Sequence, residues 1–283
     1  MTDRATQQAI IDELEVIDPA TWDVAAEAER RIAFLADYLE QTGTKGLVLG
    51  ISGGVDSSTG GRLAQLACER VRERGGDARF VAVRLPYHVQ KDEADAQAAL
   101  EFICADEVTT INIGGSTDAM WQAVMESSAT PDESTLTEFV KGNVKARMRM
   151  IAQFTVAGAR GMLVVGTDQA AEAVVGFYTK FGDGAADVLP LAGLPKRRVK
   201  EIARHLGAPE AVVEKVPTAD LESDKPLRPD EQALGVAYTD VDAYLKGEEV
   251  PAEAEKTILS WHTRTAHKRA LPLTPGQFEA RPR

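Results

Sequence analysis

Cysteine and long apolar runs are scarce in this 283-residue chain. Its two cysteines, Cys68 and Cys104, both lie within apolar helical patterns, which predicts two buried, reduced thiols rather than a disulfide or a metal site. No apolar run approaches the roughly 20 residues that a membrane span needs, and residues 1–23 lack the apolar segment of a secretory signal. We therefore expect a cytoplasmic protein that does not contact a membrane.

Positive charge is also in short supply, since the formal net charge is −12 at pH 7. Such a chain repels the phosphate backbone of a nucleic acid, and its basic clusters at 197–198 and 267–269 are short. We therefore expect no nucleic acid partner, although a few local cations can still hold a small anionic substrate. The length and the 44% apolar content suffice for one large core, so we expect residues 1–283 to form a single domain.

The most informative segment is the stretch 51–58, Ile-Ser-Gly-Gly-Val-Asp-Ser-Ser, which directly follows the apolar run 46–50. This order predicts a strand, a glycine turn and the start of a helix. Gly53 and Gly54 have no Cβ, so the turn can bring backbone N–H groups close to an anion. The carboxylate of Asp56 can bind a magnesium ion that accompanies the phosphates. Hydroxyl groups add further donors at Ser52, Ser57 and Ser58.

Two common phosphate-binding patterns are missing from this segment. The P-loop requires a lysine after its glycines, but no lysine lies between Lys45 and Lys91, and the dinucleotide pattern G-x-G-x-x-G does not fit. The order Ser-Gly-Gly-x-Asp-Ser instead resembles the pyrophosphate loop of the ATP pyrophosphatases, which split ATP between its α and β phosphates. The alternative is an ordinary Gly/Ser turn between a strand and a helix.

Strand and helix patterns alternate along the chain, which predicts an α/β fold with a doubly wound, mostly parallel five-stranded sheet and helices on both faces. In such sheets ligands gather at the carboxyl ends of the strands, where both Ser52 and Thr167 fall. The expected strands span 46–50, 80–83, 108–113, 162–167 and 188–191, and the expected helices span 25–41, 63–75, 92–103, 135–159 and 195–205.

Two segments, 85–91 and 216–230, show no clear periodicity and are predicted to be mobile loops. Beside an active site, loops of this length are often lids. A plain surface connection is the equal alternative for 216–230.

A resemblance to bacterial ammonia-dependent NAD synthetases extends over most of the chain, because several sequence blocks occur in the order found in that family. These blocks are VRLPY at 83–87, KAR at 145–147, GTDQAAEA at 166–173, GFYTKFGDG at 176–184, PTADL at 217–221 and HKR at 267–269. In that family ATP adenylates the carboxylate of deamido-NAD (nicotinic acid adenine dinucleotide), pyrophosphate leaves, and ammonia displaces AMP to give NAD. The resemblance also implies a homodimer whose dinucleotide site lies near the subunit interface.

The resemblance implies a role for each matching residue, and it implies Mg²⁺ as the metal. Asp56 and Glu172 would hold the metal. ATP would be bound by Gly50, Ile51, Ser52, Gly53, Gly54, Val55, Asp56, Ser57, Arg84, Thr167, Lys196 and Thr218. Deamido-NAD would be bound by Arg147, Lys180, Asp187, His267 and Lys268.

The chemistry explains why such residues are needed. A carboxylate is a poor acyl donor because its leaving group would be oxide, and a mixed anhydride with AMP supplies a better one. The triphosphate must be neutralised by the metal and by lysines. Because the resemblance places Lys196 on the phosphates, Lys196 is a predicted catalytic residue. Ammonia must attack as the free amine, and a nearby carboxylate that accepts a proton would help. Asp183 is the predicted acceptor and Asp220 the second choice.

Several of these residues have a simpler explanation. Asp168 and Glu172 can be acids favoured by a helix N-terminus, and His267 can be a partner of a helix C-terminus. Lys180 can be a solvated loop charge. Lys196 and Arg147 lie on predicted helices, where basic residues usually form surface ion pairs.

Three further features narrow the expected function. Gln169 stands where the resemblance leads us to expect histidine, but its amide can still make hydrogen bonds. The synthetase pattern fills the 283 residues and leaves no room for the amidase domain of glutamine-dependent relatives, so free ammonia is the expected nitrogen donor. Another adenylating amidotransferase, a tRNA-thiolating enzyme and a non-catalytic nucleotide-binding protein are the rival hypotheses. The acidic charge disfavours the second, and the joint presence of Asp56, Glu172, Lys180 and Lys196 disfavours the third.

Overall fold

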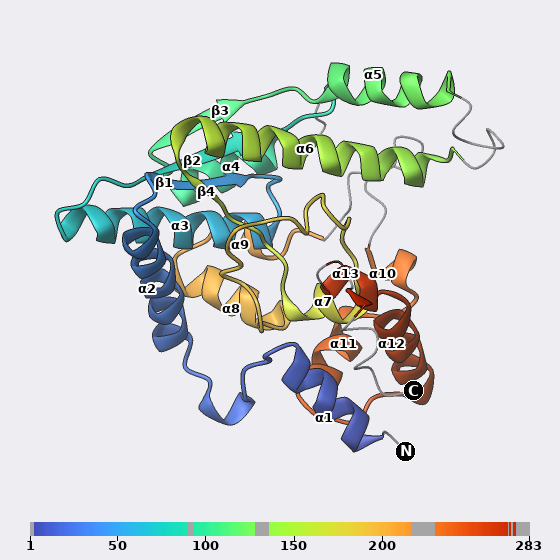
Figure 1. Ribbon diagram of the computed structural model, residues 1–283. Coiled ribbons are helices and arrows are strands. Elements are labelled where there is room, and N and C mark those ends of the chain that lie inside the picture. Colours follow the sequence, from blue (N-terminus) through green and yellow to red (C-terminus); the bar gives the residue numbers. More distant parts are fainter. Residues whose placement is uncertain are drawn as a thin grey trace.

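The chain folds around a parallel sheet with helices on both faces (Figure 1). The computed structural model describes residues 3–89, 93–127, 136–216 and 230–270, together with 272, 274 and 275. The strands are β1 (Gly46–Gly50), β2 (Arg79–Arg84), β3 (Glu107–Thr110) and β4 (Leu163–Val164). The α-helices are α1 (Arg4–Glu13), α2 (Val24–Thr42), α3 (Val55–Glu73), α4 (Glu93–Ile103), α5 (Gly114–Met125), α6 (Glu138–Arg160), α7 (Ala170–Val175), α8 (Lys196–His205), α9 (Glu210–Val213), α10 (Asp230–Leu234), α11 (Tyr238–Leu245), α12 (Ala252–Arg264) and α13 (Ala266–Arg269).

The strand order is β3-β2-β1-β4, and every pairing is parallel. The chain therefore builds outward from β1 in one direction, through β2 and β3, and then returns to the other side of β1 with β4. This reversal leaves a crevice at the carboxyl ends of β1 and β4, the position at which doubly wound folds bind their ligands.

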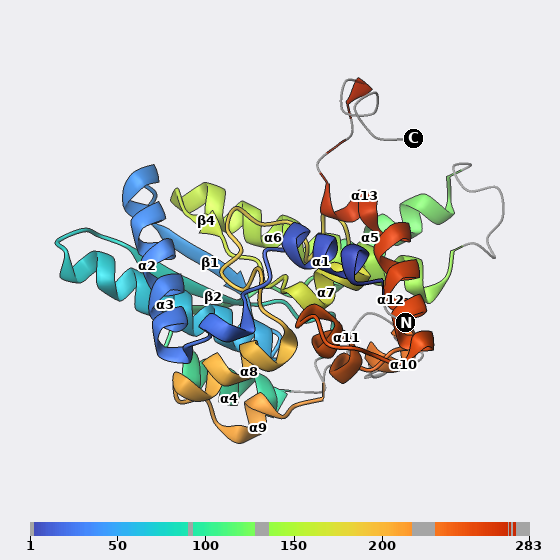
Figure 2. The ribbon, with the colours of Figure 1, turned by 90° about the horizontal axis from the view of Figure 1, so that it is seen from below.

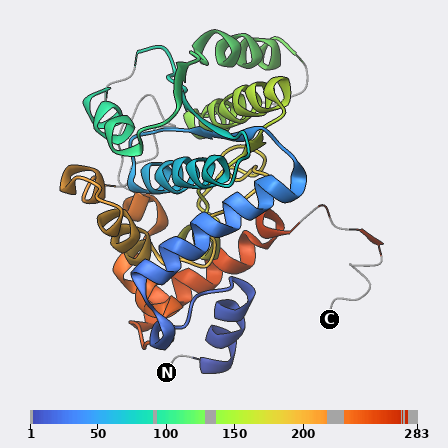
Figure 3. The same cartoon turned by 90° about the vertical axis from the view of Figure 1, so that its left-hand side faces the viewer.

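Alternating side chains of β1 explain the two layers of helices. Leu47 and Leu49 point into a core shared with α2, α3 and α8, whereas Val48 points into a second core that α6 covers. All three are almost completely buried. Figure 3 shows the sheet between the α5–α6 pair on one side and α2 and α3 on the other. Burial on both faces accounts for the uniformly apolar strands of the sequence.

A third cluster of apolar residues lies beyond the sheet, where α1, α7, α11 and α12 pack together (Figure 2). Its centre is formed by Val174, Tyr244 and Ile258, which are fully buried. The Gln7 side chain joins the first helix to this cluster by donating to the backbone carbonyl of Tyr244 over 2.8 Å. The N-terminal helix thus packs against the C-terminal third of the chain. None of the helices in the described ranges is both long and apolar enough to cross a bilayer.

The sequence prediction was wrong in two respects. Segment 188–191 is not a fifth strand, because only Val188 forms an isolated parallel bridge, to Val165, and the sheet in the described ranges has four strands. Cys68 is buried as expected, but Cys104 is exposed. Helix α4 ends at Ile103, and Cys104 takes a left-handed conformation with φ 54° that turns its side chain outward. Most of the predicted lid, residues 217–229, lies outside the described residues, and so do Thr218 and Asp220.

Candidate active site

A cavity of about 300 Å³ lies at the carboxyl ends of β1 and β4. Its walls come from the turn after β1, the first turn of α3, the segment after β4, α6 and the start of α8. Most of the predicted nucleotide and metal residues lie on it, as does the predicted proton acceptor: Gly50, Ile51, Ser52, Gly54, Val55, Asp56, Ser57, Thr167, Glu172, Asp183 and Lys196. The structure therefore brings together residues up to about 140 positions apart in sequence.

The turn after β1 needs glycine at Gly53. Its φ is 83°, in the left-handed region, and a Cβ there would lie 3.0 Å from the backbone nitrogen of Ala96 on α4. A larger residue would therefore strain the backbone and push the turn away from α4. The close approach of α4 fixes the shape of the turn that precedes α3.

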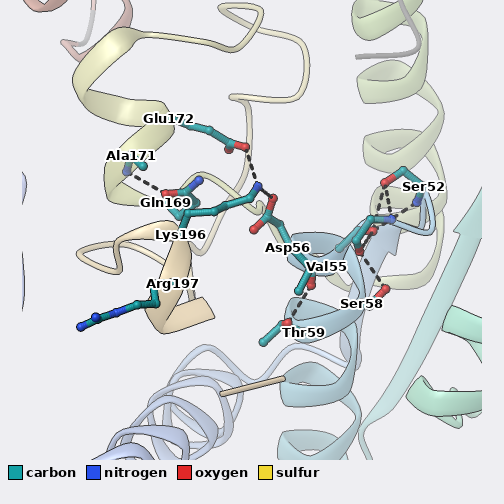
Figure 4. Close-up of polar contacts among 12 residues, drawn as sticks. Ser52, Val55, Asp56, Ser58, Thr59, Gln169, Ala171, Glu172, Lys196 and Arg197 are labelled. Carbon is teal, nitrogen blue, oxygen red and sulfur yellow. Dashed lines mark hydrogen bonds and ion pairs between the residues drawn. The ribbon is translucent and has the colours of Figure 1, made fainter. Parts of the chain in front are cut away.

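Serine side chains brace this turn. The Ser52 backbone N–H donates to Ser57 Oγ over 3.3 Å, and Ser57 Oγ donates to the Gly54 carbonyl over 3.1 Å (Figure 4). Ser58, predicted as an anion donor, is fully buried and donates to the same carbonyl over 2.8 Å. Among the described residues no side chain caps the N-terminus of α3, and Val55, Asp56 and Ser57 of its first turn line the cavity, so the N–H groups of this turn can bind an anion.

A lysine lies between the two predicted metal ligands. Lys196, which begins α8, is 5% exposed, and its Nζ donates a short hydrogen bond to Asp56 Oδ2 and lies 3.5 Å from Glu172 Oε1. Figure 4 shows this side chain reaching between the two carboxylates. Asp56 comes from the first turn of α3 and Glu172 from the first turn of α7. Three helices therefore direct their charged side chains to one point.

Burial and charge act in opposite directions on these groups. Burial raises the pKa of Glu172 well above its ordinary value, and the charge of Lys196 offsets only part of this rise. Burial alone would lower the pKa of Lys196, but the carboxylates of Asp56 and Glu172 outweigh it, so the net pKa is raised. Lys196 is therefore a cation at neutral pH.

The backbone of Lys196 is held by a residue that the sequence patterns did not reveal. Asp242 of α11 accepts the N–H groups of Lys196 and Arg197 at 2.9 and 2.8 Å. Helix α8 starts after Pro195 and has no cap from its own N-cap residue, so this distant carboxylate satisfies the first turn. Asp242 therefore fixes the main chain of Lys196 but makes no contact that fixes its side chain.

Gln169 fixes the helix that carries Glu172. It is the N-cap residue of α7, and its Oε1 accepts the N–H of Ala171 over 2.7 Å. The residue is 1% exposed. This capping bond explains how glutamine serves at a position where histidine was expected, because either side chain offers an acceptor to the helix N-terminus.

Two further carboxylates, Asp168 and Asp183, line the same cavity. Burial raises the pKa of Asp168 to about 7, and the negative charges of Asp183 and Asp56 add to the rise. Asp183 is exposed to solvent, yet desolvation by the protein around it raises its pKa as well. Its Oδ1 accepts the Thr179 N–H over 2.9 Å. Both groups can therefore accept a proton more readily than a carboxylate with an ordinary pKa.

Helix α6 contributes residues that the sequence prediction missed. Ala146, Arg149 and Gln153 line the cavity, and their spacing places them on one helical face. Gln153 Oε1 accepts the backbone N–H of Gly50 over 2.6 Å. Gly50 therefore lines the cavity, but its N–H group is already hydrogen-bonded to protein. Arg149 Nε donates to the Leu85 carbonyl over 3.1 Å. Helical spacing along α6 is the signal that could have found them.

Four of the five residues predicted to bind deamido-NAD form a second cluster. Arg147 is exposed and donates to the Lys180 carbonyl over 3.3 Å, while Lys180 donates a short hydrogen bond to the His267 carbonyl. Lys268 donates to the carbonyls of Gly176 and Tyr178 over 2.8 and 2.7 Å. These residues do not line the cavity described above. They place positive charge around the segment that carries Asp183.

Two predicted residues lie apart from both groups. Asp187 accepts the Val164 N–H over 2.7 Å at the edge of β4. Arg84 is buried and pairs with Glu93 at 3.0 Å. Neither lines the cavity. Their contacts in this structure support the fold of the site.

The donor set at the cavity fits a hard divalent cation that arrives with phosphates. Asp56 Oδ1 is buried and has no hydrogen-bond partner in the part of the chain that the structure describes. No group of three or more His, Cys, Asp or Glu side chains within the described ranges is arranged to hold a metal by itself. Mg²⁺ commonly binds through one or two carboxylates and completes its shell with phosphate oxygens and water. Asp56 and Glu172 supply such a pair.

Comparison with known proteins agrees with this geometry. The family model described as NAD synthase matches residues 27–272. The chain is 57% identical over 271 residues to the NH(3)-dependent NAD(+) synthetase of Paraburkholderia phytofirmans, covering 96% of this chain and 94% of the relative. The solved NAD+ synthetase from Burkholderia pseudomallei superposes with a TM-score of 0.82 at 53% identity, covering 96% of this chain and 98% of that one.

A second solved structure is also similar. It is the NMN synthetase from Francisella tularensis, with a TM-score of 0.78 at 32% identity, and the match covers 90% of this chain and 99% of that one. The extent and identity of these matches decide the family. The chain belongs to the NAD synthase family.

Proposed function

We propose that this protein is an ammonia-dependent NAD synthetase, a ligase that forms the C–N bond of the final step of NAD biosynthesis. It uses ATP to amidate the carboxylate of deamido-NAD and releases AMP and pyrophosphate. The observation that carries this proposal is the meeting of Asp56, Glu172 and Lys196 beside the glycine turn at the carboxyl ends of β1 and β4. The relatives with more than half of their residues identical are named for the same activity.

The first half of the reaction is an attack on phosphorus. A carboxylate oxygen of the substrate forms a bond to the α-phosphorus of ATP, and the bond from that phosphorus to pyrophosphate breaks. The N–H groups at the start of α3 and the ammonium group of Lys196 stabilise the negative charge of the departing pyrophosphate. Mg²⁺, held by Asp56 and Glu172 when bound, supplies further neutralisation of the phosphates.

In the second half, ammonia attacks the acyl carbon and AMP leaves. The nitrogen loses a proton as the amide forms, so a base close to the acyl carbon lowers the barrier. We assign this role to Asp183, which lines the cavity and has a raised pKa. The charge of Asp183 in turn adds to the rise in the pKa of Asp168.

The dinucleotide is assigned to the second cluster, next to the cavity. Arg147, Lys180, His267 and Lys268 would hold its phosphates and its nicotinate end. Burial lowers the pKa of Lys268, while the charges of Asp183 and Asp168 oppose this effect. The contacts of Lys180 and Lys268 to backbone carbonyls hold both ammonium groups in place before any substrate arrives. Thr218 keeps its assignment to ATP as a prediction, as does Arg84.

We further propose that the enzyme is a cytoplasmic homodimer that pairs through α5 and α6, with the whole chain acting as one catalytic unit. These helices lie side by side along one face of the molecule (Figure 1). They carry exposed large apolar side chains, at Met120, Met125, Phe139, Val140 and Ile151. Sedimentation equilibrium of the wild type and of Ile151→Glu tests this, because a charge at the interface should shift the mass toward the monomer.

One assay tests the activity. Protein, Mg²⁺, ATP and ammonium are mixed with no acceptor, with deamido-NAD or with nicotinic acid mononucleotide, and pyrophosphate release is measured. Release that depends on deamido-NAD is the expected result. Release that depends only on the mononucleotide would replace the proposal with the activity named for the Francisella tularensis relative. No release with either acceptor would contradict both.

The role of Asp183 has its own test. Asp183→Asn is expected to slow amidation at least tenfold with ammonium as donor, while adenylation measured by exchange of labelled pyrophosphate into ATP is retained. Wild-type turnover between pH 7 and 9 would remove Asp183 from the mechanism.

A further inference from the structure

The ammonium group of Lys196 has two possible sets of partners, the carboxylates of the site and the phosphates of the nucleotide. Its Nζ contacts Asp56 and Glu172 in this structure, whereas the proposed reaction needs the same ammonium group on the phosphates. The main chain of Lys196 is fixed by Asp242, so only the flexible side chain can move between these partners. The centroid of the Tyr238 ring lies 5.4 Å from Nζ, so this ring flanks its present position.

The metal and the ammonium group compete for the same two carboxylates, although Asp56 Oδ1 has no hydrogen-bond partner among the described residues. Asp56 Oδ2 already accepts a hydrogen bond from Nζ, and Glu172 Oε1 is 3.5 Å away, so Nζ fills the space between the two carboxylates. A divalent cation that binds both carboxylates at about 2.1 Å would lie within a few ångströms of the present position of Nζ. Two cations that close would also repel each other strongly.

We infer that the Lys196 ammonium group is the resident counter-ion of Asp56 and Glu172 in the nucleotide-free enzyme, and that a divalent metal displaces it. This inference rests on the proposed metal role of these two carboxylates. Without a polyphosphate, a displaced Lys196 would lose its partners inside a nearly buried site, which is costly. A polyphosphate gives it new oxygens. Metal and polyphosphate therefore enter together, each strengthening the binding of the other.

The test measures metal binding without catalysis. Mn²⁺ serves as the probe, and free Mn²⁺ is measured by electron paramagnetic resonance in the absence of nucleotide. Lys196→Met is expected to bind Mn²⁺ at least tenfold more tightly than the wild type, or about 1.4 kcal/mol, because the competing cation is gone. Inorganic pyrophosphate should then tighten Mn²⁺ binding to the wild type more than to Lys196→Met.

Lys200→Met is the matched control. Lys200 lies one turn later on α8 and pairs with Glu214 at 2.8 Å, so its loss removes the same charge from the same helix without touching Asp56 or Glu172. Its Mn²⁺ affinity should equal that of the wild type. Equal affinity of the wild type and Lys196→Met, or an increase in Lys200→Met as large as in Lys196→Met, would overturn the inference.

Glu172→Gln separates this inference from the proposed function. If Glu172→Gln weakens Mn²⁺ binding while Lys196→Met equals the wild type, the metal site stands and only the displacement is wrong. If Glu172→Gln leaves Mn²⁺ affinity unchanged, the proposed metal site is wrong, and the inference falls with it.

A measurement on the wild type covers the case in which Lys196→Met does not fold. Lysine amines are labelled by reductive methylation, and the label on Lys196 is read by mass spectrometry. Labelling of Lys196 should be slow in the metal-free protein and should increase several-fold with saturating Mn²⁺ alone. An unchanged labelling rate at saturating Mn²⁺ would contradict displacement.

Discussion

Replacing Asp168 with asparagine is expected to stabilise the protein at alkaline pH. This carboxyl group lies in the cavity wall just beyond β4, where burial and the charges of Asp183 and Asp56 disfavour its ionised form. Its pKa is about 7 in the folded protein, against an ordinary value of 3.8. Asparagine keeps nearly the same shape and carries no charge, so it removes the cost of ionisation.

The size and the sign of the effect follow from this pKa. Between pH 3.8 and about 7 the folded state holds the proton and the unfolded chain has released it, so the free energy of unfolding falls as the pH rises through this window. The full rise in pKa corresponds to about 4 kcal/mol, at about 1.4 kcal/mol for each pKa unit. Asp168→Asn should therefore gain up to about 4 kcal/mol at pH 8 and nothing below pH 4.

Calorimetric melting of the wild type and Asp168→Asn at pH 4, 6 and 8 checks this prediction. The variant should melt about 5 to 10 °C higher at pH 8, and the difference should shrink steadily toward pH 4. Asp77→Asn is the control, because Asp77 is exposed between α3 and β2 and its replacement should leave the melting temperature unchanged. A gain that is absent at pH 8, or that is the same at all three values, would refute the reasoning.

Three other substitutions test how the site is supported. Gln169→Ala removes the cap of α7 and should cost about 1 kcal/mol in urea unfolding. Glu27→Gln leaves Arg31, which is 4% exposed and bonded to Glu27 at 2.7 Å, without its ion-pair partner, and should cost about 3 kcal/mol in the same assay. Gly176→Ala should lower the melting temperature most, because φ is 61° and the new Cβ would lie 2.3 Å from Thr265 Cβ.

Each of these has a matched comparison. Gln169→Asn keeps an acceptor at the helix start and should regain most of the loss, and no recovery would argue against capping. Glu29→Gln breaks an exposed pair with Arg70 and should cost less than about 1 kcal/mol, and a cost equal to that of Glu27→Gln would contradict the role of burial. Gly75→Ala meets no neighbour within 4 Å at φ 90°, so it isolates the backbone part of the Gly176 effect.

Local patterns in the sequence predicted the centre of the fold well. Segment 46–58 reads as strand, glycine turn and helix, and the structure has β1 followed by α3. Apolar strands such as 80–83 and the long helical pattern at 135–159 also match their elements closely. These features depend on neighbours in sequence, which is why a single chain reveals them. Segment 188–191 has the same apolar character, but only Val188 forms a bridge, to Val165 just after β4, and the chain then turns away to α8.

Residues that act through long-range contacts were harder to find. Asp242 has no local pattern that marks it, because it supports Lys196 from 46 positions away. Asp168 was considered only as an acid favoured by a helix start, because its neighbour Asp183 approaches it only in the folded protein. The contact between Lys196 and Asp56 spans 140 positions. Contacts between residues so far apart in sequence depend on the topology of the fold. The sequence therefore shows which residues are present but not how close they lie to one another.

The carboxylate of Asp242 also has a consequence for biosynthesis on the ribosome. A nascent chain that stops before α11 already contains the glycine turn and all four strands described above, yet the start of α8 has no partner for its backbone. The start of α8, which carries Lys196, is therefore fixed only after α11 has been translated. Products that end before α11 would leave the first turn of α8 without this support.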